Sequence, residues 1–105
     1  MARQVPLATP GEILLHDWLE AFNISQYELA KAMQVPARRI NEIVQGKRSI
    51  TADTAVRLAE FFGTDAQSWM NLQAHYDAEM AKEKLGEELL SQIRRHSSVR
   101  ELVHT

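Results

Sequence analysis

The chain has 105 residues, of which 45% are hydrophobic, and a formal net charge of −2 at pH 7. This length fits one small domain, and the hydrophobic fraction indicates a folded core rather than a disordered chain. The absence of cysteine excludes disulfide bonds and zinc–thiolate sites and is typical of the reducing cytoplasm. We expect no secretory signal, and no stretch approaches the roughly 18 apolar residues of a membrane span. A soluble cytoplasmic protein without membrane contact is therefore predicted.

The first predicted helix begins at residues 9–12, where the sequence Thr-Pro-Gly-Glu has the pattern of a capping box with proline at the first helical position. Residues 1–8 before it are expected to form an N-terminal arm. The apolar residues of this helix recur at helical spacing. They are Ile13, Leu14, Trp18 and Phe22.

The second and third predicted helices are short and lie close together in the sequence. A second capping box at residues 25–28, Ser-Gln-Tyr-Glu, opens a helix that runs to about Met33. Pro36 suits the first turn of the next helix, which continues to about Val44. Gly46 is expected to end it, because glycine tolerates the left-handed conformation found after helix ends.

Two further helices are predicted from their caps. Thr51 caps the fourth, and Asp53 favours its positive end. Gly63 closes it, and residues 64–67 begin the fifth. Both have one apolar side. In the fourth helix the residues expected to face inward are Ala55, Leu58, Ala59 and Phe62, and in the fifth the residues along one side are Trp69, Leu72, Tyr76 and Met80.

Beyond Ala81 the sequence becomes rich in charge. A further amphipathic helix is expected, interrupted or entered at Gly86, and the last nine residues are expected to be frayed. Its apolar residues are Leu85, Leu89, Leu90 and Ile93. No strand-like alternation occurs anywhere, so the predicted fold class is all-α. We therefore divide the chain into the arm 1–8, a helical domain at 9–81 and a C-terminal helical extension at 82–105.

The second and third helices meet the physical requirements of a helix-turn-helix. Ala30 supplies the small residue where the two helices cross, and Val35 supplies an apolar plug for the turn. Ile40 and Ile43, with Val44, anchor the third helix inward. Its opposite face carries residues spaced by one, three and four, which therefore share one side. They are Ala37, Arg38, Asn41 and Gln45.

The charge is distributed unevenly along the chain. From Ile24 to Ile50 five basic residues stand against two acidic ones, a local balance of +3, which leaves −5 for the remainder. The basic residues are Lys31, Arg38, Arg39, Lys47 and Arg48. A basic island in an acidic body suits a small DNA-binding protein with a separate surface for protein contacts.

These segments resemble a known family. Gln26, Leu29-Ala30, Ile40 and Gly46-Lys47 are similar to the lambda-repressor-like (Xre) helix-turn-helix. More narrowly, the chain resembles the HigA antitoxins of bacterial type II toxin–antitoxin modules over about residues 8–80. The matching segments are 10–14 (PGEIL), 29–32 (LAKA), 35–43 (VPARRINEI), 46–55 (GKRSITADTA) and 62–64 (FGT) through 69–73 (WMNLQ). Gln34 departs from the family, which often has glycine in this turn, so slight strain is expected there.

The resemblance implies a five-helix bundle, a homodimer that binds a palindromic operator and represses its own operon, and no catalytic activity. It also implies a partner, a small basic toxin protein of the RelE-like ribonuclease type. Three alternatives stay open: a stand-alone repressor without a toxin, an interaction module that does not read DNA, and, last, an enzyme.

The position of each residue on the motif predicts its role on double-stranded DNA. Arg38 and Asn41 suit the edges of guanine and adenine, and the helix start suits a thymine methyl group. The predicted base contacts are Pro36, Ala37, Arg38, Asn41 and Gln45. The predicted phosphate contacts are Gln26, Arg39, Lys47, Arg48 and Thr51. The alternative is that Arg38 and Arg39 are merely solvated charges on an exposed helix.

The aromatic stripe Trp69, Leu72 and Tyr76 has two interpretations. It packs the fifth helix onto the bundle, or it forms the two-fold interface that a palindromic operator requires. The four histidines have no metal-ligand spacing, and no glycine-rich phosphate loop is present. We therefore expect no metal, no cofactor and no small-molecule substrate.

Overall fold

The structure, a computed structural model, describes residues 6–97 and 99, and every regular element in that part of the chain is helical. The elements are α1 (Pro10–Ile13), η1 (Leu14–Leu19, a π-helix), α2 (Gln26–Met33), α3 (Ala37–Val44), α4 (Ala52–Phe62), α5 (Ala66–Leu85) and α6 (Glu87–Arg95). The fold class predicted from the sequence, all-α, is confirmed.

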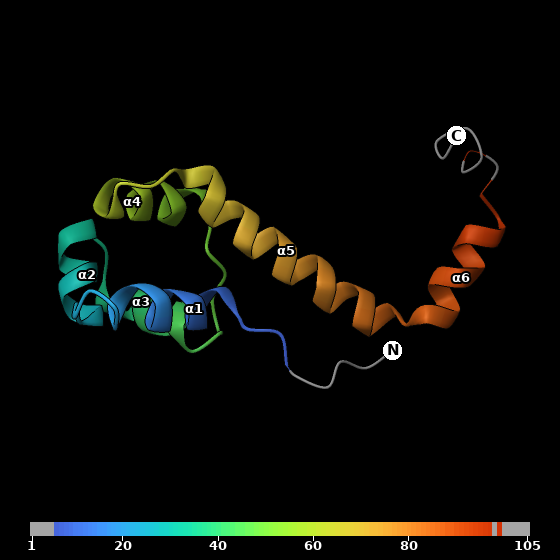
Figure 1. Ribbon diagram of the computed structural model, residues 1–105, viewed down its shortest axis with the longest axis horizontal. Coiled ribbons are helices and arrows are strands. Elements are labelled where there is room, and N and C mark those ends of the chain that lie inside the picture. Colours follow the sequence, from blue (N-terminus) through green and yellow to red (C-terminus); the bar gives the residue numbers. More distant parts are fainter. Residues whose placement is uncertain (1–5, 98, 100–105) are drawn as a thin grey trace.

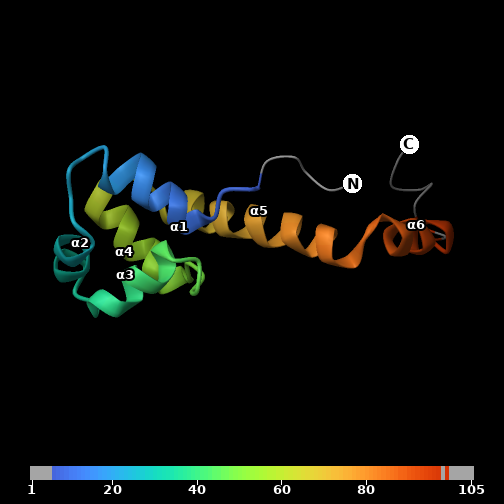
Figure 2. The same cartoon turned by 90° about the horizontal axis from the view of Figure 1, so that it is seen from below.

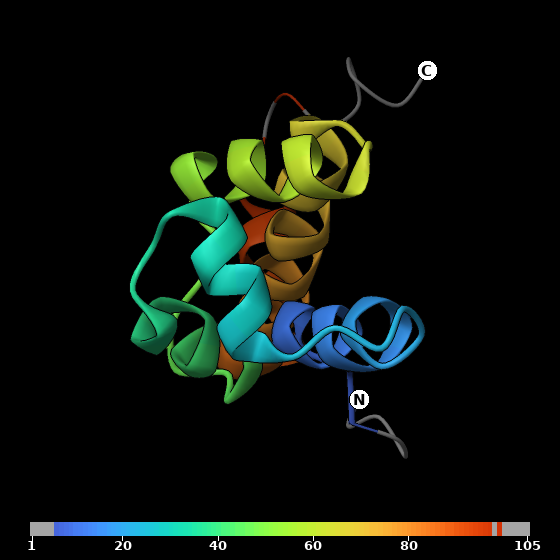
Figure 3. The ribbon, with the colours of Figure 1, turned by 90° about the vertical axis from the view of Figure 1, so that its left-hand side faces the viewer.

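The helices divide into a head and an outer segment (Figures 1 and 2). We call residues 9–76 the head and residues 80–95 the outer segment. In the head, α2 packs on α3 and α4, α1 packs on α3, and both α4 and α1 contact α5. The rest of α5 runs out to α6, and the molecule measures 51 × 28 × 22 Å along its principal axes. Seen end-on, α4 lies along one side of the head and α1 along the other, with α2 between them (Figure 3).

The head surrounds one apolar core. Leu14, Leu29, Ile40 and Leu58 are completely buried in it, and Trp69 joins it from α5 at 2% exposure. Rings from three elements pack beside this core: the centroid of Trp18 lies 4.9 Å from that of Phe62 and 5.2 Å from that of Trp69. Such offset aromatic pairs add to the stabilisation by burial itself.

The first helix differs from its prediction. It begins as expected at Pro10, capped by the Thr9 hydroxyl, which accepts a 3.0 Å bond from the amide of Glu12. It then widens into the π-helix η1, whose amide at Glu20 donates to the carbonyl of Leu15, and it ends at Leu19. Phe22 therefore lies beyond the helix to which the sequence pattern assigned it, and it is 60% exposed.

Capping chemistry sets most of the other boundaries as predicted. At Ser25 both halves of the capping box form: the amide of Glu28 donates to the serine hydroxyl at 3.0 Å, and the Glu28 carboxylate accepts from the Ser25 amide at 3.1 Å. Gly63 ends α4 in the left-handed conformation. Thr51 occupies the N-cap position of α4, but its hydroxyl donates to Thr54 Oγ1 at 3.5 Å and accepts no bond from the backbone amides of the helix.

The long helix α5 continues through Ala81 to Leu85, so the division placed after residue 81 falls inside a helix and stays a prediction. Gly86, with φ 85°, separates α5 from α6, as the sequence predicted. α6 has no buried residue, and Met80, on the apolar side of α5, is 40% exposed. The frayed tail expected at residues 97–105 lies almost wholly outside the described residues, as do residues 1–5 of the N-terminal arm.

Candidate nucleic-acid interface

Helix α3 has two distinct sides, as the sequence predicted. Ile40 and Ile43 are 0% and 1% exposed and fix the helix to the core. The side chain of Arg38, on the other side, is 82% exposed. A helix held by two buried isoleucines presents its outer side chains from a rigid support, which is what insertion into a DNA groove requires.

The N-terminus of α1 presses directly on the end of α3. A Cβ atom added at Gly11 would lie 1.8 Å from the carbonyl oxygen of Ile43 and 2.9 Å from the Cα of Val44. Only glycine permits this approach, and it buttresses α3 from behind. Sequence reasoning assigned Gly11 only to the cap of the first helix, because a contact between residues so far apart leaves no local signal.

The predicted base-contacting residues lie at the start and on the outer side of α3. Pro36 is exposed but stands at the N-cap position, with φ −61° and ψ 141°, so its predicted place in the first helical turn is wrong by one residue. Ala37 is half-buried against the core, so its methyl group is less open than the pattern predicted. Arg38 and Gln45 are exposed, and Asn41 is half-buried.

Asn41 and Gln26 meet across the turn of the motif. The Asn41 side-chain amide donates to Gln26 Oε1 at 2.7 Å, joining the outer side of α3 to the first turn of α2. The sequence predicted a base contact for one and a phosphate contact for the other, but not this bond between them. The bond fixes both amide groups relative to each other, so they form one polar unit beside the start of α2.

The turn between the two helices contains the strain that the sequence predicted. Gln34 adopts the left-handed conformation, with φ 59° and ψ 45°, where glycine is the usual residue. Its amide donates to the carbonyls of Ala30 and Lys31 and so closes the end of α2. Val35 is half-buried against the core, as expected of the apolar plug.

Two arginines share the carboxylate of Glu42 on the outer side of α3. Arg38 Nε donates to Glu42 Oε2 at 3.0 Å, and Arg48 Nε donates to Glu42 Oε1 at 3.0 Å, with Arg48 Nη2 in an ion pair 2.8 Å from the same oxygen. These guanidinium bonds, that of Arg38 first, lower the pKa of Glu42 below its usual 4.5. Glu42 was not among the predicted site residues, although its spacing of four from Arg38 was a local signal for the pair.

A second carboxylate, that of Asp53 in α4, also joins two arginines. Arg57 Nε donates to Asp53 Oδ2 at 2.9 Å, and Arg39 Nη1 donates to the same oxygen at 2.6 Å. Arg57 also donates to the carbonyl of Met33 at 2.8 Å, which ties the end of α2 to α4. These bonds lower the pKa of Asp53, through Arg57 first. Arg39, at 27% side-chain exposure, is therefore part of a tie between α3 and α4.

The segment after α3 carries the remaining predicted phosphate contacts, Lys47, Arg48 and Thr51, and all three are exposed. It begins at Gly46, with φ 77°, and is fixed further on by a buried bond in which Ile50 N donates to Gln73 Oε1 of α5 at 2.8 Å. No local pattern predicted this bond, because its partners are 23 residues apart. The segment thus holds its basic side chains in a defined place beside α3.

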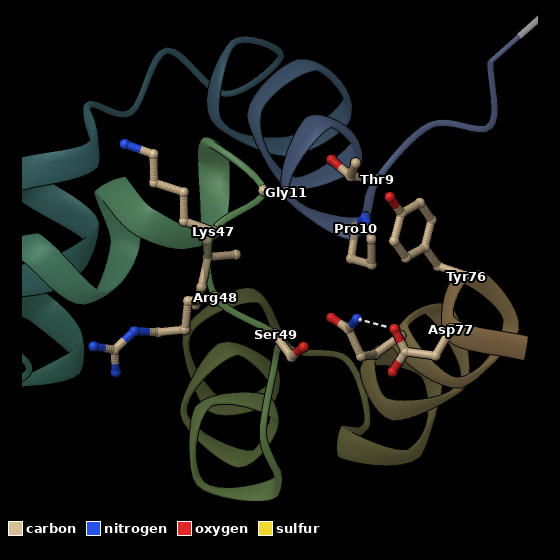
Figure 4. A pocket seen from close by; sticks show the side chains of 11 residues that line it. Thr9, Pro10, Gly11, Lys47, Arg48, Ser49, Tyr76 and Asp77 are labelled. Carbon is tan, nitrogen blue, oxygen red and sulfur yellow. Dashed lines mark hydrogen bonds between the residues drawn. The ribbon is translucent and has the colours of Figure 1, made fainter. Parts of the chain in front are cut away.

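A small pocket of about 110 Å³ lies between this segment, α1 and α5 (Figure 4). The side chains of Lys47 and Arg48 extend away from Tyr76 and Asp77, which stand on its other side. Within it, Gln73 Nε2 donates to Asp77 Oδ1 at 2.9 Å. The two basic side chains therefore point away from the pocket, and that of Arg48 donates to Glu42.

The predicted interface residues on α5 do not share one environment. Trp69 is 2% exposed, and its indole Nε1 donates to Thr64 Oγ1 at 2.8 Å. This fits core packing, the first of the two interpretations of the stripe, for Trp69. Leu72 and Tyr76 are half-buried. Leu72 also lines a shallow hollow of about 460 Å³ with Trp18, Thr64, Asp65, Ser68 and Trp69.

The described residues contain no group of three histidine, aspartate or glutamate side chains placed to hold a metal ion. His16 instead bonds to Glu20 Oε1 at 2.8 Å, one helical turn away. No helix among residues 6–97 is long and apolar enough to cross a membrane.

Comparison with known proteins places this geometry in a family. The family model described as Helix-turn-helix matches residues 15–69. Virulence-associated protein I of Dichelobacter nodosus is 51% identical over 80 residues, which cover 76% of this chain and 74% of that protein. The family match spans more than half of the chain.

Solved structures of similar proteins include complexes with DNA. The Pseudomonas aeruginosa protein PA4674, in complex with its 18-bp operator DNA, is 41% identical and superposes with a TM-score of 0.79 over 84% of this chain and 95% of that one. The antitoxin HigA of Pseudomonas aeruginosa, with the higBA promoter, is 42% identical and has a TM-score of 0.75 over 87% and 95% of the two chains. The chain belongs to the helix-turn-helix family, in its Xre-type branch, and its structural neighbours there are HigA antitoxins.

Proposed function

We propose that this protein is an operator-binding regulator of the HigA antitoxin type, which acts as a homodimer in the cytoplasm and represses its own operon. The observation that carries the proposal is the exposed polar side of α3, with Arg38 82% exposed above two buried isoleucines. Similar proteins have been solved with operator and promoter DNA. These two facts support binding of double-stranded DNA through α3.

Each predicted contact takes its role from its place on this surface. Arg38 suits guanine O6 and N7, and Asn41, oriented by Gln26, suits adenine. Pro36, Ala37 and Gln45 complete the proposed base contacts. Gln26 lies in the first turn of α2, where unpaired backbone amides favour a phosphate. The other proposed phosphate contacts are Arg39, Lys47, Arg48 and Thr51, of which Arg39 is the most restrained because Asp53 binds it.

The test begins with a duplex selected by the wild-type protein from a random pool and a scrambled duplex of the same composition. Arg38→Ala is expected to lose about 1–3 kcal/mol on the selected duplex and to relax discrimination at one base pair. Lys47→Ala is expected to weaken binding to both duplexes alike and to reduce the salt slope by about one. Arg95→Ala, in α6, is the matched control and is expected to change neither affinity.

Equal binding of the wild type to the selected and scrambled duplexes would contradict the base-reading roles. Loss of affinity in the Arg95→Ala control equal to that in Arg38→Ala would place the DNA elsewhere on the molecule. A footprint of the protein on its own upstream region then tests the autorepressor role directly.

The homodimer is proposed because a palindromic operator requires a two-fold symmetric protein. The half-buried Leu72 and Tyr76 are the interface candidates that remain once Trp69 is placed in the core. Tyr76→Glu is expected to sediment as a monomer while its circular dichroism stays helical. A folded variant that still sediments as a dimer would remove Tyr76 from the interface.

The antitoxin role requires a second partner, a small basic toxin protein of the RelE-like ribonuclease type. The observation that favours a separate partner surface is the exposed apolar pair Leu89 and Ile93 on α6, at 41% and 57% exposure. The N-terminal arm is the other candidate for this partner surface. Its Leu7 is half-buried, and its Val5 lies outside the described residues.

Co-expression with the product of the adjacent reading frame tests the antitoxin role. Co-purification of a small basic protein and rescue of growth would support it. An intact operator function without any such partner would favour the alternative of a stand-alone repressor.

A further inference from the structure

Glu42 is an acidic residue on the side of α3 proposed to meet DNA, a polyanion. Its side chain is 22% exposed and lies between Arg38, on the same helix, and Arg48, in the segment that follows. A carboxylate at such a place opposes DNA binding unless its charge has another use. The guanidinium bonds keep the pKa of Glu42 below its usual value, so the group is ionised at neutral pH.

The two arginines are held in different ways. Among the described residues Arg38 donates only through Nε, so one of its five N–H donors is used there, and the four on the terminal nitrogens are left for acceptors on DNA. That terminal edge is the one that binds guanine O6 and N7 in pairs. Arg48 donates to Oε1 through Nε, and its Nη2 lies 2.8 Å from the same oxygen, so the edge of the guanidinium that carries both nitrogens faces the carboxylate.

The same carboxylate therefore has opposite consequences for its two partners. For Arg38 the bond fixes the side chain of a highly exposed residue and aims its terminal nitrogens outward. For Arg48 the bond occupies the edge that a phosphate would bind, and it neutralises the charge that a phosphate would attract. Arg38 serves base reading, and Arg48 serves binding to any sequence, so both effects favour the operator over other DNA.

We propose that Glu42 is a specificity-determining residue, which positions Arg38 for a base edge and restrains Arg48 from the phosphates of arbitrary DNA. The proposal rests on the DNA-binding function proposed above. Glu42 acts through the two arginines and touches no nucleotide in this role, so it is a positioning residue.

The test is the isosteric substitution Glu42→Gln, which removes the charge and keeps an acceptor oxygen. Binding to the selected and scrambled duplexes is measured by fluorescence anisotropy over a range of salt concentrations. Affinity for the scrambled duplex is expected to rise about three- to tenfold, because the ion pairs that restrain Arg48 are weakened. The salt slope on that duplex is expected to steepen by about one, the effect of one further phosphate contact.

On the selected duplex the change is expected to be smaller, so the ratio of the two affinities falls. Discrimination at the base pair that Arg38→Ala relaxes is expected to weaken in Glu42→Gln as well. A role confined to folding would change neither the slope nor the discrimination at one base pair, and a thermal unfolding scan checks that the variant is folded.

Glu60→Gln is the matched control, because Glu60 is exposed on α4 and its substitution changes the net charge by the same amount. It is expected to leave the affinity ratio unchanged. The double variant Glu42→Gln with Arg48→Ala is expected to lose the gain on the scrambled duplex, because the gain comes from the released Arg48.

Three results would overturn the proposal. Equal effects of Glu42→Gln and Glu60→Gln would reduce it to a general charge effect. Loss of affinity for the selected duplex alone would show that Glu42 itself accepts from a base, such as cytosine N4. Retention of the gain in the double variant would exclude Arg48 as its source. A wild type that selects no duplex would instead refute the DNA-binding function.

Discussion

Between residues 9 and 76 each helix buries side chains against another helix, whereas α6 buries none. The buried apolar residues of the head recur at helical spacing, and they pack against one another. The apolar residues of the outer segment follow the same pattern, yet Leu85, Leu89 and Ile93 are 51%, 41% and 57% exposed. Amphipathic spacing thus predicts a helix in both regions, but it predicts a core only where a second element covers the apolar side.

The ion pairs of the head also connect more of the structure than the ion pair of α6 does. In the head, Glu42 and Asp53 each join two arginines from different elements or turns. In α6 the pair of Arg94 with Glu87 lies within one helix. Each of these two carboxylates therefore connects two parts of the head, through Arg48 and Arg39 respectively, whereas the pair in α6 supports only its own helix.

The largest expected effect is on the free energy of unfolding, when an isoleucine is replaced by alanine in the head and, for comparison, in the outer segment. Ile40→Ala removes a side chain that is 0% exposed and leaves a cavity, so the free energy of unfolding is expected to fall by about 2–5 kcal/mol. Ile93→Ala, at 57% exposure, is expected to change it by less than about 0.5 kcal/mol. Urea denaturation followed by circular dichroism measures both. Equal losses would show that the outer segment is covered within the chain.

The packing of α1 on α3 is tested at Gly11. Gly11→Ala places a Cβ 1.8 Å from the Ile43 carbonyl oxygen, so the two helices must separate, and we expect a loss of about 1–3 kcal/mol or more. Gly63→Ala is the control, because its surroundings are open and only its left-handed backbone, φ 72°, opposes a side chain. It is expected to lose about 1 kcal/mol. A similar result at both positions, measured by urea denaturation, would contradict the close contact.

The strain in the motif turn predicts a gain. Gln34→Gly is expected to stabilise the head by up to about 1 kcal/mol, since the left-handed conformation at φ 59° suits glycine, less the greater entropy of glycine in the unfolded chain. Ala32→Gly, an exposed position within α2, is expected to lose about 1 kcal/mol and serves as the control. Thermal unfolding of both variants gives the comparison. A loss at Gln34 as large as that at Ala32 would show that the turn is unstrained.

The smallest expected effect concerns pH and the carboxylates of the head. The arginine bonds lower the pKa values of Glu42 and Asp53 below their usual 4.5 and 3.8. Each pair therefore stabilises the fold fully above the usual pKa and loses its contribution as the pH falls through the lowered value. We expect Tm to decline below about pH 4.5, and Asp53→Asn to flatten part of that decline. Glu60→Gln is expected to leave the decline of Tm with pH as steep as in the wild type. If Glu60→Gln flattened it as much as Asp53→Asn does, Asp53 and its arginines would have no specific role in it.

Local chemistry made much of the head predictable from the sequence. Ser25 and Glu28 form a complete capping box, and Gly63 and Gly86 mark helix ends, because each of these effects involves residues within one turn of each other. The inward places of Ile40 and Ile43 also follow from spacing alone. These are the features that depend on the chain within a few residues.

The features that the sequence did not reveal join distant residues. The bond between Arg39 and Asp53 spans fourteen positions, and that between Ile50 and Gln73 spans twenty-three. The widening of the first helix into a π-helix likewise has no local signature, and the helix ends before Phe22. In the candidate site, the outer side of α3 was predictable from the sequence. The bond between Arg39 and Asp53 was not, because these residues come together only in the folded chain.

Gln73 is buried, and its carbonyl oxygen accepts the backbone amide of Ile50, two residues beyond Arg48. Leu72 and Tyr76, which flank it on α5, are the proposed subunit contacts. A shift or rotation of α5 at that interface would consequently move the loop that carries Lys47 and Arg48, because the buried amide of Ile50 cannot lose its acceptor without a replacement. Dimerisation and affinity for DNA would then be coupled through the side-chain amide of Gln73.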